Sequence, residues 1–235
     1  MVAQDVVSPR FDSIADTIEA FRRGEFIVVL DSQDRENEGD LIIAAEAITT
    51  EKMAFMIRYT SGYICAPITC SMTERLELPQ MVSENTETHR TAYTVSIDAS
   101  DPSITTGISA HDRALTCRTL ASPSAKPSSF RRPGHTLPLR ARDGGVLVRT
   151  GHTEAAVDFC HLAGFQPAAV ICEMIEDGEE IVGLAERRGA GMMRRDGCLE
   201  FGRKWGLKVC TIEDLVTYIK HQEKGMNGMN GNNGV

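Results

Sequence analysis

Short apolar runs separated by polar, Gly-rich or Pro-rich segments recur along the whole chain. Most of these runs are rich in β-branched residues and are too short for helices, so they are typical of buried strands. We expect strands at 26–30, 41–44, 63–69, 91–98, 136–140, 146–149, 168–174 and 207–210.

Segments with apolar residues at helical spacing lie between these runs. Capping residues mark several of their starts, among them Ser13, Thr49, Ser109 and Thr211, and Gly164 follows the end of one. We expect helices at about 12–23, 49–59, 73–78, 109–120 and 152–163, and two more that end near Trp205 and Gln222. Strands and helices mix without a clean βαβ alternation, which predicts one mixed α/β (α+β) domain.

The remaining segments predict loops and two loose ends. We expect a flexible leader at 1–10, a single catalytic domain at 11–224 and a disordered Gly/Asn/Met tail at 225–235. Ser122–Arg132 is rich in Ser and Pro and predicts a loop, and Ser83–Arg90 predicts another. Asp143-Gly-Gly145 predicts a hairpin turn between two strands, and the polar stretch 176–195 predicts a surface excursion.

Composition narrows the class of protein. The 235 residues carry a formal net charge of −8, which leaves no basic face for a nucleic acid backbone. The apolar runs are too short to span a bilayer, and the N-terminus lacks the apolar core of a secretory signal. The seven cysteines are odd in number and contain no CxxC spacing, which argues against a disulfide framework or a zinc site. We expect a cytoplasmic protein with reduced cysteines.

The stretch Asp31-Ser-Gln-Asp-Arg-Glu-Asn-Glu-Gly-Asp40 holds five carboxylates and one arginine between two predicted strands. Carboxylates packed so closely repel one another unless a cation is present, and hard oxygen ligands suit Mg²⁺ or Mn²⁺. The alternative is a solvated turn. Arg35 inside the cluster, and Gly39, which permits a tight bend, favour a site.

A second candidate segment is Arg149-Thr-Gly-His-Thr153, where a strand meets the start of a helix. Free backbone N–H groups and the positive end of the helix make such a junction an anion cradle. Arg149 adds a bidentate phosphate partner, and Thr153 adds a hydroxyl donor. Alone, His152 would be a capping histidine, but beside the acidic stretch an imidazole completes a ligand set for a divalent ion.

Two further residues are candidates for acid–base chemistry. Glu173 ends an apolar strand, where a carboxylate is costly to bury unless it is paired or protonated, so it is a general-base candidate. His135 follows Pro and Gly, which fix the backbone that presents it. The chemistry alone therefore predicts a metal-assisted enzyme for a small phosphorylated substrate. Two alternatives remain. One is a metal-dependent sugar-phosphate phosphatase or isomerase, and the other is a non-enzymatic or RNA-related nucleotide-binding domain.

Several motifs together resemble one enzyme family, 3,4-dihydroxy-2-butanone 4-phosphate synthase of riboflavin biosynthesis. They fall in the family's order and spacing over roughly Ile14 to Tyr218, and combined motifs are far more specific than any one alone. These motifs are Asp34-Arg-Glu-Asn-Glu-Gly-Asp40, Thr105-Thr-Gly-Ile-Ser109, Arg132-Pro-Gly-His135, Arg149-Thr-Gly-His-Thr-Glu154 and Cys172-Glu173.

The resemblance implies a lyase that converts D-ribulose 5-phosphate into L-3,4-dihydroxybutan-2-one 4-phosphate and formate with Mg²⁺ or Mn²⁺. It implies Glu36 and His152 as metal ligands. Candidates for proton transfer are His135, Glu173, Glu38 and Asp40. Substrate contacts would come from Arg35, Glu36, Asp40, Thr105, Arg149, Thr150, Gly151, His152, Thr153 and Glu173.

The resemblance also implies a three-layer α/β/α domain around a mixed sheet, and a homodimer in which the neighbouring subunit can supply His135. Two departures stand out: 176–195 is longer and more basic than the usual connection, and Thr150 stands where glycine is frequent. No partner domain for a second activity follows in this sequence, so we expect a monofunctional enzyme.

Overall fold

The computed structural model describes residues 10–230, with the backbone alone for 225–230. A seven-stranded mixed sheet forms its centre, with the strand order β11-β1-β2-β6-β3-β5-β4. β1 pairs in parallel with β11 and β3 with β5, while the other neighbours are antiparallel. The strands are β1 Ile27–Leu30, β2 Gly39–Ala44, β3 Cys65–Ile68, β4 Ile97–Ala99, β5 Phe130–Arg140, β6 Ala169–Glu173 and β11 Lys208–Thr211.

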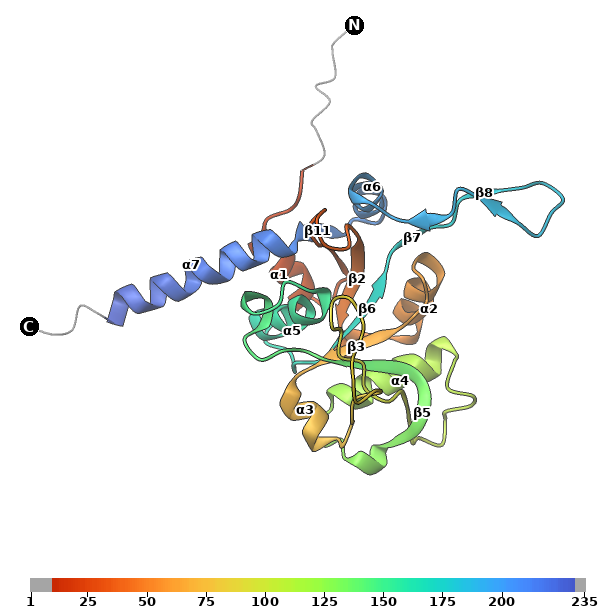
Figure 1. The fold of residues 1–235 in the computed structure, drawn as a ribbon, viewed down its shortest axis with the longest axis horizontal. Coiled ribbons are helices and arrows are strands. Elements are labelled where there is room, and N and C mark those ends of the chain that lie inside the picture. The colour runs from red at the N-terminus through yellow and green to blue at the C-terminus, as the bar shows by residue number, and fades with distance from the viewer. Residues whose placement is uncertain (1–9, 231–235) are drawn as a thin grey trace, which may run out of the picture.

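Helices cover both faces of the sheet (Figure 1). α1 Ile14–Arg22, α5 His152–Ala163 and the start of α7 Ile212–Asn230 pack on one face. α2 Thr50–Tyr59, α3 Cys70–Arg75, α4 Ala110–Ala121 and α6 Arg195–Trp205 pack on the other. Three short 3₁₀ helices complete the connections: η1 Ala45–Ala47, η2 Pro127–Ser129 and η3 Gly145–Leu147. The predicted three-layer α/β/α architecture around a mixed sheet is confirmed.

The central strands are buried on both faces, which explains why they read as continuous apolar runs. Side chains alternate across each strand, so Val28 and Leu41 belong to one core, while Val29 and Ile42 belong to the other. In the second core, the rings of Phe21 on α1 and Phe159 on α5 lie 5.8 Å apart. Two separate cores therefore hold the helices to the two faces of one sheet.

Four expectations for the middle of the chain differ from the structure. The predicted loop 122–132 gives way at Phe130 to β5, which continues to Arg140 through Pro133 and Gly134. The predicted strand 146–149 is absent, because Gly144 and Gly145 take positive φ and lead into η3 instead of a hairpin. Of the expected strand 91–98, only its end lies in β4, and the short helix expected at 73–78 begins earlier, at Cys70.

The surface excursion 176–195 forms an arm of short strands, which extends from the body of the molecule (Figure 1). β7 Ile175–Glu176 pairs with β10 Gly191–Met192, and β8 Glu179–Glu180 pairs with β9 Arg187–Arg188. At the other end of the chain, α7 continues past Gln222 and takes in part of the segment expected to be a disordered tail. The rest of that tail, 231–235, and the leader up to residue 9 lie outside the described residues.

No helix in the described part of the chain combines the length and the apolar character that a bilayer crossing requires. All seven cysteines are free, and six of them are buried, as expected for reduced thiols. The division into leader, domain and tail remains a prediction.

Candidate active site at the end of the central strands

The acidic stretch forms the loop between β1 and β2, and Asp31 organises it. The carboxylate of Asp31 accepts hydrogen bonds from the backbone N–H groups of Glu36 and Glu38, each at 2.9 Å. Arg35 Nη1 donates to the same carboxylate at 2.9 Å and also pairs with Glu36. Because both oxygens of Asp31 are used and its side chain is buried, Asp31 shapes the loop and leaves other carboxylates to face the site.

The register of the central strands brings two predicted carboxylates together. β2 and β6 run antiparallel with Asp40 directly opposite Glu173, and β1 places Val29 opposite Asp40 on the other side. Neighbouring residues of this kind have side chains about 5 Å apart. Glu173 Oε2 also accepts a hydrogen bond from Ser61 Oγ at 2.9 Å. Residues that are distant in the sequence therefore meet because the sheet aligns them.

His152 lies at the first turn of α5 and points into this group. Its Nε2 donates to the backbone oxygen of Val29 at 3.1 Å, which leaves Nδ1 as the acceptor nitrogen. Nδ1 lies 4.0 Å from Glu36 Oε2 and 3.9 Å from Asp40 Oδ1. Anchoring one ring nitrogen to a backbone carbonyl is the usual way in which proteins orient a metal-binding imidazole.

The ligand atoms fit a divalent cation. Two sets of three groups place one oxygen or nitrogen each within 4.8 Å of one another, with His152 in both: Asp31, Glu36 and His152, and Glu38, Asp40 and His152. Asp40 Oδ1 is buried and has no hydrogen-bond partner among the described residues. A buried carboxylate oxygen without a partner is costly, and a hard cation beside an imidazole would satisfy it.

Burial and mutual repulsion shift the protonation of these groups in the metal-free protein. Burial, followed by the charge of Glu36, raises the pKa of Glu38 to about 7. Burial and the charge of Glu173 raise the pKa of Asp40 well above its ordinary value. Burial lowers the pKa of His152 to about 4, so its imidazole is neutral at pH 7 and can act as a ligand. Shifted pKa values at one point are typical of active sites.

The predicted anion cradle lies beside these carboxylates, at the N-terminus of α5. Arg149 Nη1 donates to the buried carboxylate of Glu154 at 2.6 Å, and its other nitrogens reach Thr91 Oγ1 and the backbone oxygen of His89. These bonds hold the guanidinium plane in place. The helix cap is Gly151, which has no capping side chain, so the first turn of the helix presents its N–H groups with Thr153 close by.

One small cavity of about 60 Å³ connects these elements. Apart from the predicted residues, it is lined by five residues that the sequence did not suggest as substrate contacts: Cys65, Thr91, Tyr93, Leu139 and Ile171. His89 also belongs to the site, since its Nε2 lies 3.9 Å from Glu36 Oε1. The predicted residues that line the cavity are Arg35, Glu36, Glu38, Asp40, Arg149, His152, Thr153 and Glu173.

Two of the predicted residues, His135 and Thr105, belong to a second cluster, where β4 pairs with β5. His135 Nδ1 lies 2.9 Å from Asp98 Oδ2, and the backbone N–H of His135 donates to Asp98 Oδ1 at 2.8 Å. Gly107 packs directly against this pair, where a larger side chain would collide with both Asp98 and His135. Thr105, two residues away, donates to Asp112 at 2.8 Å. Neither His135 nor Thr105 lines the site cavity.

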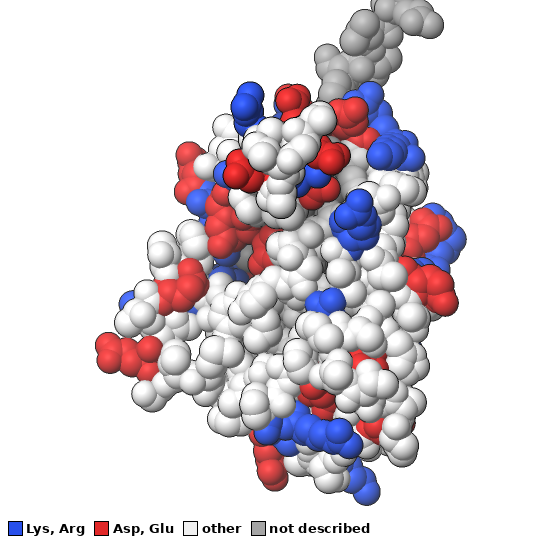
Figure 2. Space-filling model, turned by 90° about the vertical axis from the view of Figure 1, so that its right-hand side faces the viewer, with Lys and Arg blue, Asp and Glu red and all other residues white. Residues whose placement is uncertain are grey.

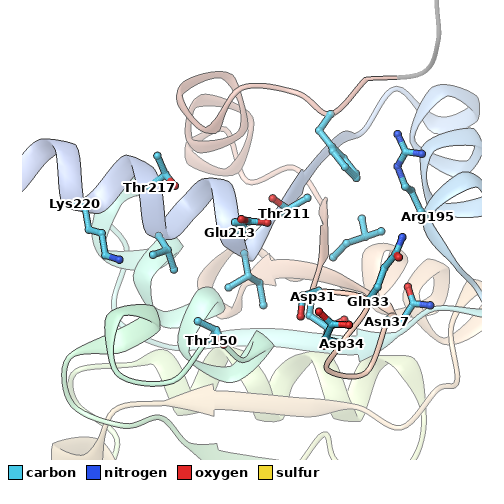
Figure 3. A pocket seen from close by; sticks show the side chains of 15 residues that line it. Asp31, Gln33, Asp34, Asn37, Thr150, Arg195, Thr211, Glu213, Thr217 and Lys220 are labelled. Carbon is cyan, nitrogen blue, oxygen red and sulfur yellow. The ribbon is translucent and has the colours of Figure 1, made fainter.

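A larger cleft of about 750 Å³ borders a different part of the acidic loop (Figure 3). It is formed with α7 and the start of α6, and it shares no lining residue with the small cavity. Thr150 lies here, while Gly151 lines neither space. Asp31, Asp34 and Asn37 of the loop thus line the large cleft, whereas Arg35, Glu36 and Glu38 line the site cavity.

The fold and the site define a metal-assisted α/β enzyme for a small anionic substrate. The sequence model of the 3,4-dihydroxy-2-butanone 4-phosphate synthase family matches residues 15–218. The chain therefore belongs to the 3,4-dihydroxy-2-butanone 4-phosphate synthase family.

Relatives and solved structures agree with this assignment. The 3,4-dihydroxy-2-butanone 4-phosphate synthase of Pyricularia oryzae is 61% identical over 213 residues, which cover 91% of this chain and 91% of the relative. That of Schizosaccharomyces pombe is 53% identical, with coverage of 88% and 97%. A crystal structure of a 3,4-dihydroxy-2-butanone 4-phosphate synthase in complex with two magnesium ions matches with a TM-score of 0.90 and 61% identity, over 91% of this chain and 99% of the other.

Proposed function

We propose that this protein is the lyase that converts D-ribulose 5-phosphate into L-3,4-dihydroxybutan-2-one 4-phosphate and formate in riboflavin biosynthesis. Membership of the family supports the reaction. The observation that carries the proposal is the convergence of Glu36, His152 and Asp40 beside Arg149 in one cavity. This arrangement combines a cation site with a phosphate cradle, as an enediol-forming sugar-phosphate enzyme requires.

The cofactor that we propose is Mg²⁺ or Mn²⁺, held by Glu36 and His152. A divalent cation acts as a Lewis acid that stabilises the charge of an enediolate on two adjacent substrate oxygens. The fit rests on the free Nδ1 of His152 and on the buried, unpartnered oxygen of Asp40. Arg35 supplies positive charge next to Glu36 and Asp31 in the metal-free protein.

The remaining groups suit the proton transfers. Removal of the C3 proton, loss of water, the 1,2-carbon shift and release of C4 as formate each need groups that gain and lose protons near neutral pH. Glu38, with a pKa of about 7, meets that requirement directly. Ser61 orients Glu173, and Asp40 lies opposite it in the sheet. Arg149 and Thr153, at the start of α5, would bind the phosphate.

We also propose a homodimer, in which the second cluster of one subunit completes the cavity of the other. His135 has a carboxylate partner, Asp98, that orients its ring, yet it lies outside the cavity of its own chain. Orienting a histidine in this way is typical of a catalytic acid or base. A two-fold dimer would bring His135 and the Thr105 segment to the neighbouring site.

The substrate class and compartment follow from charge and chemistry. The net charge of −8, and the mixture of acidic and basic side chains on the face drawn in Figure 2, suit a small sugar phosphate bound by a few cradle groups rather than a nucleic acid. Seven free cysteines suit a reducing compartment. We therefore propose that the enzyme works in the cytoplasm.

Labelled substrate tests the reaction. We expect ribulose 5-phosphate carrying ¹³C at C4 to yield ¹³C-formate when it is incubated with the protein and Mg²⁺, as followed by ¹³C NMR. Inorganic phosphate in place of formate would instead support a phosphatase, and loss of no carbon atom would support an isomerase.

Complementation between inactive variants tests the dimer. Glu36→Gln and His135→Ser are each expected to be inactive as pure proteins. Reassembled as a mixture, they should regain about a quarter of the activity, because half of the dimers carry one intact site formed from both chains. Absence of any recovery in proven mixed dimers would place His135 and Glu36 in the same subunit's site.

A further inference from the structure

Arg194 lies outside the site cavity but contacts the backbone of the loop that forms it. It is the residue before α6, and its side chain reaches back to the acidic loop. Nη1 donates to the backbone oxygen of Glu36 at 2.9 Å and also to the backbone oxygen of Asn37. One of these carbonyls belongs to the proposed metal ligand itself.

These two hydrogen bonds complete the support of the loop. The N–H groups of Glu36 and Glu38 are bound by Asp31 from within the loop. Asn37, between them, has a φ of 52°, a left-handed conformation that is strained for a residue other than glycine. The carbonyls of residues 36 and 37 are bound by Arg194. The strained turn is therefore supported on its N–H groups by Asp31 and on its carbonyls by Arg194.

The arm determines where Arg194 lies. The N–H of Met193 donates to the oxygen of Met174 at 3.0 Å, and the N–H of Met174 donates to the oxygen of Gly39 at 2.8 Å. Pairing of β7 with β10 returns the chain to this point after the excursion. Gly39 permits close contact with α6, because a Cβ there would lie 2.7 Å from Cys198 Sγ. The backbone that carries Arg194 is thus tied to the segments next to Glu173 and Asp40, on β6 and β2.

We propose that Arg194 is a positioning residue, which holds the acidic loop in the conformation that presents Glu36 to the cation. This inference rests on the proposed metal site and extends it to a side chain that touches neither cation nor substrate. The cationic guanidinium makes charge-assisted bonds to the two carbonyls, and such bonds are stronger than neutral ones. Without them, the loop would leave the strained turn for part of the time, and cation binding would have to restore it.

Direct binding of Mn²⁺, measured from the electron paramagnetic resonance signal of free Mn²⁺, tests the inference without any turnover. We expect Arg194→Met to raise the Kd for Mn²⁺ about tenfold, which corresponds to about 1.4 kcal/mol. Arg194→Lys keeps one donor and should fall between wild type and Arg194→Met. Hydrogen exchange at the amides of residues 36–38 should be faster in Arg194→Met, because the loop opens more often.

A matched control lies in the arm. Arg187 also donates to two backbone oxygens, those of Asp177 and Gly178, but it is remote from the loop. We expect Arg187→Met to change the Kd by less than about twofold. An unchanged Kd in Arg194→Met, or an equal weakening in both variants, would overturn the inference. If Arg194→Met does not fold, the Kd for Mn²⁺ is compared between Arg194→Lys and Arg187→Lys. A higher Kd in Arg194→Lys alone would support the inference, and equal Kd values would overturn it.

Glu36→Gln separates this inference from the proposed metal site. If Glu36→Gln binds Mn²⁺ as tightly as wild type, the metal site itself is wrong. If Glu36→Gln loses Mn²⁺ while Arg194→Met retains wild-type affinity, the metal site stands and only the role of Arg194 fails.

Discussion

The carboxyl group of Glu38 gives the metal-free protein a characteristic dependence of stability on pH. Its pKa rises from an ordinary value of 4.5 to about 7 in the folded state, chiefly because the group is partly buried and lies near Glu36 and Glu173. The folded state therefore binds this proton more tightly than the unfolded state does. The resulting contribution to stability is present below pH 4.5 and is lost as the pH rises to about 7.

The size of the effect follows from the shift. Moving a pKa from 4.5 to about 7 corresponds to about 3.4 kcal/mol for a fully shielded group. Glu38 is only half-buried, so solvent screening reduces the value, and we expect about 1–2 kcal/mol. Glu38→Gln preserves the shape of the side chain and removes its charge. At pH 8 the metal-free variant should therefore be more stable than wild type by about 1–2 kcal/mol.

Urea unfolding in the presence of EDTA at pH 5 and pH 8 measures this difference. Wild type should lose more stability between the two pH values than Glu38→Gln does. Mg²⁺ added in excess over the EDTA should restore the stability of wild type at pH 8, because it binds the folded state. Equal losses in the two proteins would show that Glu38 is not held in a repulsive cluster, and the electrostatic description of the loop would fail.

Three further predictions concern the ligands, the cradle and the core. Glu36→Gln and His152→Ala should each lower kcat/KM by about 10³-fold or more and weaken Mn²⁺ binding. Both variants should keep a near-native circular dichroism spectrum, and normal turnover in either would contradict the ligand assignment. Arg149→Ala should raise KM about tenfold or more with a smaller change in kcat, since phosphate binding is largely uniform, and an unchanged KM would place the phosphate elsewhere. Phe159→Ala should lower the free energy of unfolding by about 3–5 kcal/mol, and a loss below about 1 kcal/mol would contradict the packing of α1 on α5.

The elements around the acidic loop could be predicted because their signals are local. β1 and β2 are apolar runs with clear boundaries, and α5 begins at His152 and ends before Gly164 as its pattern indicates. The reason for Gly39 is different from the predicted one. The bend lies at Asn37, while Gly39 is needed because Cys198 on α6 approaches it closely.

β5 could not be recognised from its composition, because Pro133 and Gly134 normally interrupt a strand. Gly134 is required there by tertiary structure, since its backbone lies against that of Ile97 and Asp98 in β4. β4 itself shifts register at this point. A pairing between segments that are far apart in sequence therefore overrides the local signal.

In the site, too, residue types could be predicted from the sequence, whereas contacts between distant segments could not. Glu36, His152 and Glu173 could be suggested by residue type and by resemblance, but the register of β2 with β6, which sets Asp40 opposite Glu173, could not. His89 escaped notice because a polar loop has no periodic pattern, and Thr91 was expected to begin a strand. Glu87 orders that loop by accepting hydrogen bonds from the N–H groups of both residues, and such local bonding to the backbone is visible only in the structure.

Anomalous X-ray diffraction from a crystal soaked in Mn²⁺ tests the central claim most directly. The account predicts a manganese peak within bonding distance of the Glu36 carboxylate and of His152 Nδ1, beside Arg149. A peak at another place, or an ordered site with no manganese at saturating concentration, would contradict it.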